Sequence, residues 1–181
     1  MGLANFFRRN PLEGPAADLY AEIVRQSRIP AFYEVAAVPD TVDGRFEMIS
    51  LHAFLIMRQL KGEGKQAQKL SQALFDEMFA DMDQSLREIG IGDLSVGKHI
   101  KKMAKAFYGR VAAYDSALDG EGAETLEEAL LRNHYGTVED VPAEAVAALA
   151  GYMRAADMRL KGQGVDALMQ GRADFGGFLP R

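Results

Sequence analysis

The stretch LSQALFDEMFADMDQSLREIG (70–90) and the following DLSVGKHIKKMAKAFYGRVAAYDSAL (93–118) carry the clearest periodicity in the chain. Successive residues of a helix are about 100° apart, and at this angle the apolar residues of each segment fall on one side. The spacing predicts two amphipathic helices joined by a short Gly-rich connector that acts as a hinge. Their predicted apolar faces comprise Leu70, Leu74, Phe75, Met78, Met82, Leu86 and Ile89, and then Val96, Ile100, Met103, Phe107, Val111, Tyr114 and Leu118.

The second of these helices also has a basic face opposite its apolar one, formed by Lys98, Lys101, Lys102 and Lys105. A lysine near an anionic membrane surface contributes about 1 kcal/mol to binding, and lysines also contact the phosphates of RNA. The basic face therefore has two interpretations: a contact surface for an anionic membrane or ribosomal RNA, or an ordinary solvated surface.

Composition and termini restrict the class of protein. A chain of 181 residues with 48% hydrophobic content predicts one domain with one core. The net charge of -5 argues against a protein whose whole surface attracts nucleic acid. With no Cys, the chain has no disulfide and no thiolate site. Residues 1–14 match neither a signal peptide nor a myristoylation motif, and we expect a flexible N-terminus in which Phe6, Phe7, Arg8 and Arg9 either fray or touch a membrane weakly.

The remaining segments predict further helices, because none of them alternates with a period of two. We expect helices over residues 16–28, 45–60, 125–133 and 142–160, with Asp140 as the N-cap of the last. The helix over 45–60 is apolar nearly all round, so it is expected to be central and buried, and it is too short to span a membrane. Residues 171–181 are expected to form a C-terminal tail, with Phe175 and Phe178 docking on a groove. The predicted fold is all-α: a single-domain irregular helical bundle of about six to seven helices, over residues 15–170.

One formal motif match concerns nucleotides. The segment Gly92-Asp-Leu-Ser-Val-Gly97-Lys98 has the spacing of a phosphate-binding loop. That loop requires a preceding strand and, after the Lys, a Ser or Thr that binds magnesium. Here a predicted helix precedes the segment and His99 occupies the Ser/Thr position. Nucleotide binding is therefore not expected.

The three histidines form no recognisable metal or catalytic pattern. A di-iron site in a helical bundle needs Glu-x-x-His pairs, which the sequence lacks. We interpret His52, inside the central helix, as a buried neutral imidazole bonded to a neighbour. A Ser-His-Asp triad assembled in space stays open as an alternative. We otherwise expect no catalytic residue, no cofactor and no metal ion.

Several short segments, in this order along the chain, resemble the ubiquinol-cytochrome c chaperone family. The similarity covers roughly Leu19 to Leu118, and the chain beyond Ala123 matches only loosely. The most specific segments are Pro30-Ala-Phe32-Tyr33, Val38-Pro39-Asp40-Thr41, Asp43-Gly44-Arg45-Phe46, Leu74-Phe75-Asp76, Asp81-Met82-Asp83, Leu86-Arg87-Glu88, Gly92 to Lys98, Phe107-Tyr108-Gly109-Arg110 and Ala113-Tyr114.

The resemblance implies a largely helical, non-enzymatic chaperone that binds newly made cytochrome b during assembly of the ubiquinol-cytochrome c reductase, respiratory complex III. It also implies a small partner protein and, in mitochondria, contact with the ribosome. Because the chain has no Arg- and Ser-rich leader, we expect a bacterial cytoplasmic version that is peripheral to the inner membrane. Two alternatives stay open: a haem-handling protein or enzyme using His52 or His99, and an interaction module for another membrane complex.

A client that is an apolar membrane helix needs a groove lined by aromatic and Met side chains. The Met residues of the predicted apolar faces serve either as this lining or as ordinary core filler. The candidate client or partner residues are Phe32, Tyr33, Phe75, Phe79, Asp81, Met82, Asp83, Arg87, Phe107, Tyr108 and Arg110. The candidate residues for contact with the membrane or ribosome are Lys98, Lys101, Lys102 and Lys105.

Overall fold

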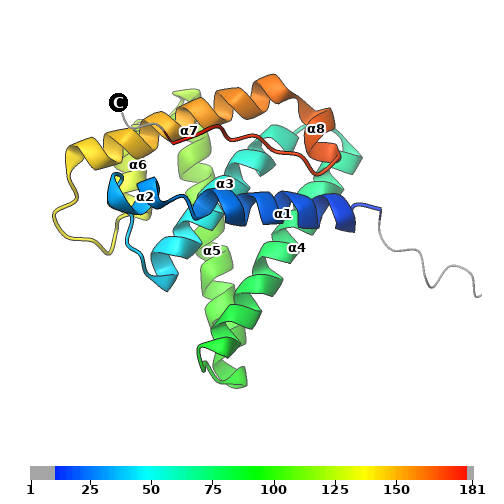
Figure 1. Ribbon diagram of the computed structural model, residues 1–181, viewed down its shortest axis with the longest axis horizontal. Helices are drawn as coiled ribbons and strands as arrows, with labels where there is room; N and C mark the ends of the chain where they lie inside the picture. Colours follow the sequence, from blue (N-terminus) through cyan, green and yellow to red (C-terminus); the bar gives the residue numbers. More distant parts are fainter. Residues whose placement is uncertain (1–10, 179–181) are drawn as a thin grey trace, which may run out of the picture.

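The computed structural model describes residues 11–178, and this part of the chain folds into eight α-helices without a strand (Figure 1). The predicted all-α, single-domain class is confirmed. Phe6, Phe7, Arg8 and Arg9 lie outside the described residues. The helices are α1 (Glu13–Ser27), α2 (Pro30–Glu34), α3 (Val42–Leu60), α4 (Lys65–Glu88), α5 (Asp93–Asp119), α6 (Leu126–Asn133), α7 (Ala143–Gln163) and α8 (Val165–Met169). The helices that the sequence did not predict, α2 and α8, have five residues each, too few for a 3.6-residue period to be recognised.

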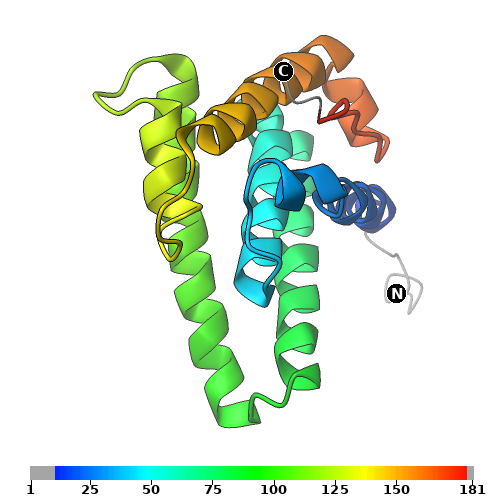
Figure 2. The same ribbon diagram turned by 60° about the vertical axis from the view of Figure 1, so that its left-hand side comes forward.

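The predicted pair of amphipathic helices forms an antiparallel hairpin, α4 and α5, whose connection lies at one end of the molecule (Figure 2). Val96, Phe107 and Tyr114 are buried along α5, and the other predicted apolar residues of that helix are partly buried against the core. Ile89 was predicted on the apolar face of α4 but is 58% exposed, because it caps the helix at the outer end of the hairpin. Gly97 lies inside α5, so the formal phosphate-loop motif is helical and forms no loop.

Helix α3 is the centre of the fold, as its apolar sequence predicts. It begins three residues earlier than expected, because the Thr41 side chain caps it and accepts a hydrogen bond from the Gly44 N–H at 3.1 Å. Gly44 lies directly against the preceding turn, and a Cβ at this position would be 2.0 Å from the Pro39 carbonyl oxygen. Helices α1, α4 and α7 pack around α3, which buries eleven of its residues. No helix within residues 11–178 has both the length and the apolar content needed to cross a bilayer.

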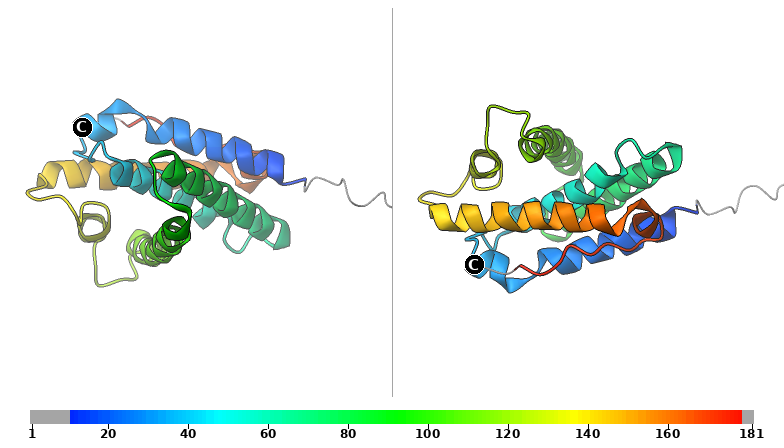
Figure 3. Two further views of the ribbon diagram at one scale, coloured as in Figure 1. Left: turned by 90° about the horizontal axis from the view of Figure 1, so that it is seen from below. Right: turned by 90° about the horizontal axis from the view of Figure 1, so that it is seen from above.

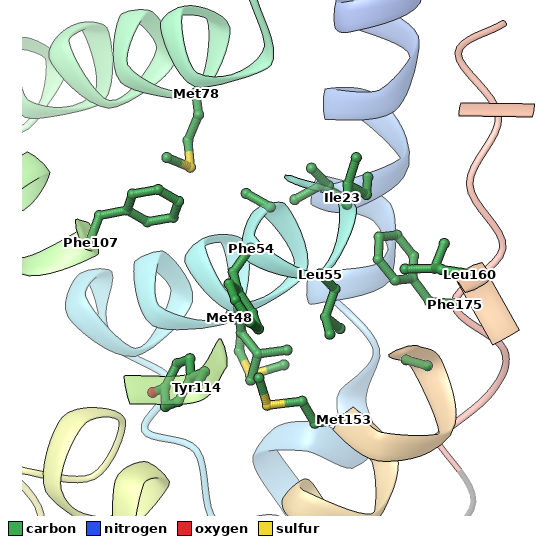
Figure 4. Close-up of a cluster of buried hydrophobic side chains, with 14 of the residues drawn as sticks. Ile23, Met48, Phe54, Leu55, Met78, Phe107, Tyr114, Met153, Leu160 and Phe175 are labelled. Atoms are coloured by element: carbon green, nitrogen blue, oxygen red, sulfur yellow. The ribbon is translucent and has the colours of Figure 1, made fainter. Parts of the chain in front are cut away.

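The core joins side chains from both ends of the chain. Figure 4 shows Ile23 of α1, Leu55 of α3, Met78 of α4, Phe107 of α5 and Met153 of α7 converging on it. Residues 171–178 run between α1 and α7 (Figures 1 and 3). The expected docking of the C-terminal segment is confirmed by the burial of its rings, since Phe175 is 2% and Phe178 is 6% exposed.

One predicted helix start is wrong. Asp140 was expected to cap α7, but Pro142 occupies the N-cap position with an extended backbone. Asp140 has φ +55, a left-handed conformation, whereas an N-cap residue usually has an extended backbone from which its side chain reaches the first helical N–H groups. The start of α6 agrees with the sequence, because Thr125 and Glu128 form a reciprocal capping box.

Candidate functional site

A groove of about 660 Å³ lies between the C-terminal half of α3, the N-terminal half of α4 and the middle of α5. We call it the aromatic groove. Three helices meet here because the turn between α3 and α4, with Gly62 and Gly64 at positive φ, reverses the chain beside α5. The apolar side chains that line it are Phe54, Met57, Leu60, Phe75, Phe107, Tyr108 and Val111.

Aromatic rings in contact form one wall of this groove. The ring of Phe75 stacks on the exposed ring of Tyr108, with centroids 5.5 Å apart, and lies 5.8 Å from Phe107. Phe79, behind them, is 4.5 Å from Phe75. Such ring pairs are favourable at these separations and hold the side chains in place. The groove therefore presents a largely preformed apolar surface.

A charge network fixes one rim of the aromatic groove. The guanidinium of Arg58 in α3 forms ion pairs with Asp115 and Asp119 of α5 and with Asp157 of α7, the last at 3.1 Å. Lys61 reaches Asp115 at 2.6 Å. The hydrogen bonds that Arg58 donates to Asp119 and Asp115 raise its pKa, although partial burial acts against them. These contacts tie three helices together beside the groove.

A second groove of about 700 Å³ lies between α1, α2, the start of α3 and the end of α4. It contains Tyr33, Asp81 and Met82 from the predicted client set. The Tyr33 hydroxyl donates a hydrogen bond to the Ser27 carbonyl oxygen at 2.8 Å, and Asp81 accepts one from the Tyr20 hydroxyl at 2.6 Å. Two of these three residues are thus already held by structural contacts.

The structure divides the predicted client residues among several places. Phe75, Phe107 and Tyr108 line the aromatic groove, whereas Tyr33, Asp81 and Met82 line the second groove. Phe32 lies in the core instead, fully buried against Tyr152 and Phe178. Phe79 is 8% exposed and supports the ring of Phe75. The remaining three form ion pairs. Arg87 pairs with Asp83 and with Asp93 at the end of the hairpin, and Arg110 pairs with Glu47.

Two partly exposed residues of the apolar lining were missed by the sequence interpretation as client contacts. Met57 and Val111 lie on the apolar lining beside Phe107. Met57 sits on the helix that is apolar all round, so periodicity does not show which of its faces is open. Val111 belongs to the predicted apolar face of α5, and its incomplete burial depends on how far α3 extends along α5.

A buried polar cluster lies beneath α6, where α3 and α5 meet it. Arg110 pairs with Glu47, and its Nη2 also donates to the Asn133 carbonyl oxygen at 3.5 Å. Burial raises the pKa of Glu47 to about 7, because removal from water outweighs the attraction of Arg110. Burial, together with the charge of Arg110, lowers the pKa of His134 to about 3. Near neutral pH His134 is therefore an uncharged core residue.

His52 is a buried neutral imidazole, as predicted. Its Nδ1–H donates to the Met48 carbonyl oxygen at 2.7 Å, and its Nε2 accepts from the Tyr152 hydroxyl at 2.7 Å. Burial lowers its pKa to about 4. Both ring nitrogens are thus occupied by protein groups, which leaves neither available to a haem iron. His99, the other candidate of the haem alternative, is exposed on α5. Within residues 11–178 no three His, Cys, Asp or Glu side chains are placed to hold a metal ion together.

Comparison with known proteins connects this architecture to a family. Residues 34–175 match the family described as ubiquinol-cytochrome C chaperone. The chain is 25% identical over 118 residues to ubiquinol-cytochrome-c reductase complex assembly factor 1 of Xenopus laevis, and 24% identical over 103 residues to the human protein of that name. It covers 58% of the Xenopus protein and 34% of the human one, so it spans little more than half of the former and a third of the latter.

A solved structure agrees with the sequence match. The crystal structure of the Cbp3 homolog from Brucella abortus is similar to this fold with a TM-score of 0.81 and 40% sequence identity. The similarity covers 93% of this chain and 92% of that one. Because the family match spans most of the chain and the fold agrees over nearly all of it, this chain belongs to the ubiquinol-cytochrome c chaperone family.

Proposed function

We propose that this protein is a non-enzymatic chaperone that binds newly made cytochrome b and promotes assembly of the ubiquinol-cytochrome c reductase. Family membership supports the assembly role, since the relatives are named as assembly factors of that complex. The observation that carries the client-binding part is the open aromatic groove, in which the accessible side chains of Met57, Phe75 and Tyr108 lie over the buried ring of Phe107. An apolar helix docks on such a surface by inserting its side chains between rings and thioethers.

The lining of the groove suits a membrane-protein client that has not yet assembled with the other subunits of its complex. Rings and the flexible Met57 side chain adapt to differently shaped apolar residues, and binding hides surface that would otherwise aggregate. The rim carries Lys61 and Lys65, both exposed. The second groove remains the alternative position for the client or for a small partner protein.

The test uses a bacterial strain in which the gene for this chain is deleted and replaced by variants. Assembly is measured by the difference spectrum of b-type haem and by blotting of cytochrome b. We expect the deletion to lower both signals and the unaltered gene to restore them. Normal levels of assembled complex III in the deletion strain would overturn the proposal.

Two matched substitutions separate the grooves. Met57→Glu places a carboxylate on the lining of the aromatic groove, and Val42→Glu places one at the second groove, where Val42 is 56% exposed. Each substitution adds one negative charge, so the two variants have the same net charge as each other. Thermal melts check that both variants fold. We expect Val42→Glu to restore cytochrome b and Met57→Glu to fail. The reverse result would move client binding to the second groove.

A further inference from the structure

One exposed face of helix α5 consists of four lysines with an apolar or aromatic residue at each end. At about 100° per residue, its outward positions fall within about 120° of arc, opposite the buried Val96, Phe107 and Tyr114. Leu94 at one end is 100% exposed, and Tyr108 at the other is 59% exposed. We call this face the lysine stripe, and it consists of Leu94, Lys98, Lys101, Lys102, Lys105 and Tyr108.

The lysine stripe concentrates positive charge on a protein whose net charge is -5. Helix α5 contains no acidic residue between Asp93 and Asp115. In the part of the chain that the structure describes, residues 11–178, none of the four lysines takes part in an ion pair, in contrast to Arg58, Arg87 and Arg110. Four unpaired cations in a row attract an extended anionic surface.

The two apolar ends of the stripe indicate which anionic surface it fits. A fully exposed Leu gains free energy only where it can leave water, and Tyr is favoured at the boundary between headgroups and acyl chains. Lysine stems can lie along an apolar layer while their ammonium groups reach phosphates. Recognition of RNA relies more on Arg, whose planar guanidinium binds phosphate in two places and stacks on bases, and the stripe contains no Arg.

We propose that the lysine stripe docks α5 on an anionic phospholipid bilayer, with Leu94 entering the headgroup layer. Ile89, 58% exposed at the same end of the hairpin, lines the second groove and does not belong to the stripe. This end stands clear of the other helices in Figure 2, so a flat surface can approach it. Docking through this face holds the protein peripherally on the bilayer surface.

This docking orients the molecule. The ring of Tyr108 belongs to the stripe and also stacks on Phe75 in the aromatic groove. A bilayer on the stripe therefore borders the groove, where an apolar segment leaving the membrane first meets protein. The docking itself does not depend on the identity of the client, so it can be tested with lipids alone.

The experiment measures cosedimentation of the full chain with vesicles of phosphatidylcholine, with and without phosphatidylglycerol. Each lysine near an anionic surface strengthens binding about fivefold. The variant Lys98→Glu/Lys101→Glu/Lys102→Glu should therefore bind phosphatidylglycerol vesicles at least about a hundredfold more weakly. The matched control Lys69→Glu/Lys161→Glu/Arg172→Glu changes the net charge equally at exposed basic residues away from α5 and the aromatic groove, and it should bind nearly as well as the unaltered chain. Equal losses in the two variants would overturn the proposal.

A neutral substitution tests insertion separately from charge. Leu94→Ser should weaken vesicle binding about tenfold, because a buried Leu side chain is worth at least about that factor. Binding to ribosomal RNA, measured in parallel, should be weaker than to the vesicles and indifferent to this substitution. If Leu94→Ser leaves vesicle binding unchanged and RNA binds as well as lipid, the stripe is a general polyanion surface and the bilayer proposal fails.

Discussion

At the scale of single residues, burial controls the ionisation of the polar cluster beneath α6. His134 is 4% exposed and packs its ring against Tyr135 at 5.0 Å between centroids. Because burial lowers the pKa of His134, its ring binds a proton more readily in the unfolded chain than in the folded one. Glu47 has the opposite behaviour, because its raised pKa lets the folded state keep a proton up to about pH 7.

These shifts predict how stability depends on pH. A histidine with a folded pKa of about 3 contributes stability that is fully present above pH 6.5, its unfolded value, and is lost as the pH falls towards 3. We expect His134→Phe, which keeps a ring in place, to reduce the loss of unfolding free energy on acidification by about 1.4 kcal/mol per pH unit between about pH 5.5 and pH 4. Urea unfolding of both proteins across this range provides the measurement.

The comparison with the unaltered chain cancels the other buried groups. His52 contributes with the same sign as His134, whereas Glu47 opposes both between pH 4.5 and about 7. Both groups are present in the two proteins. Parallel curves of unfolding free energy against pH would show that His134 is not protonated selectively in the unfolded state.

At the scale of helices, α3, α5 and α7 are held together by Arg58. Its side chain is 16% exposed, and two of its partners, Asp115 and Asp157, are equally sheltered. Asp157 also accepts a hydrogen bond from the Gln59 side chain at 2.7 Å. Because three carboxylates share one guanidinium, removing the cation leaves partly buried negative charges that repel each other.

We therefore expect Arg58→Met to lower the free energy of unfolding by about 3 kcal/mol. The control is Arg154→Met, which removes an exposed ion pair between Arg154 of α7 and Glu127 of α6 and should cost less than about 1 kcal/mol. Thermal or urea unfolding at neutral pH compares the two variants. A loss of equal size in both would mean that the Arg58 network contributes no more than a surface pair.

At the scale of the whole molecule, the segment 171–178 closes the core formed by α1, α3 and α7. The Gln26 side chain in α1 donates to the Gly176 carbonyl oxygen at 2.7 Å and also to the Tyr152 hydroxyl of α7 at 3.0 Å. Phe175 contacts His52 edge to face at 4.9 Å between centroids. The segment 171–178 is thus part of the fold and covers the buried histidine.

Replacing this ring should weaken the whole molecule. We expect Phe175→Ala to cost about 3–5 kcal/mol, because it leaves a cavity beside His52 and Leu160. Leu131→Ala is the comparison, since Leu131 is 48% exposed and its truncation should change the free energy of unfolding by less than about 1 kcal/mol. Urea unfolding distinguishes the two. If Phe175→Ala lowers the free energy of unfolding as little as Leu131→Ala does, residues 171–178 contribute little to the stability of the core.

Much of the fold and part of the candidate site could be predicted from local patterns. The period of 3.6 residues located the hairpin of α4 and α5, the apolar composition of residues 45–60 located the central helix, and short motifs located the family. The aromatic wall formed by Phe75, Phe107 and Tyr108 was also within reach, because antiparallel helices of a hairpin bring such positions together. The five-residue helices α2 and α8 were missed because one turn of helix has no measurable period.

The sequence by itself determined the all-α class, the hairpin and its basic outer face, because these depend on spacings within single helices. Only the tertiary structure decided which candidate residues are available to a client. Phe32 is buried because Tyr152 and Phe178, more than a hundred positions away, pack on its ring. Arg110 is paired because α3 brings Glu47 to it. Contacts of this kind depend on how separate helices pack, which no local pattern of residues specifies.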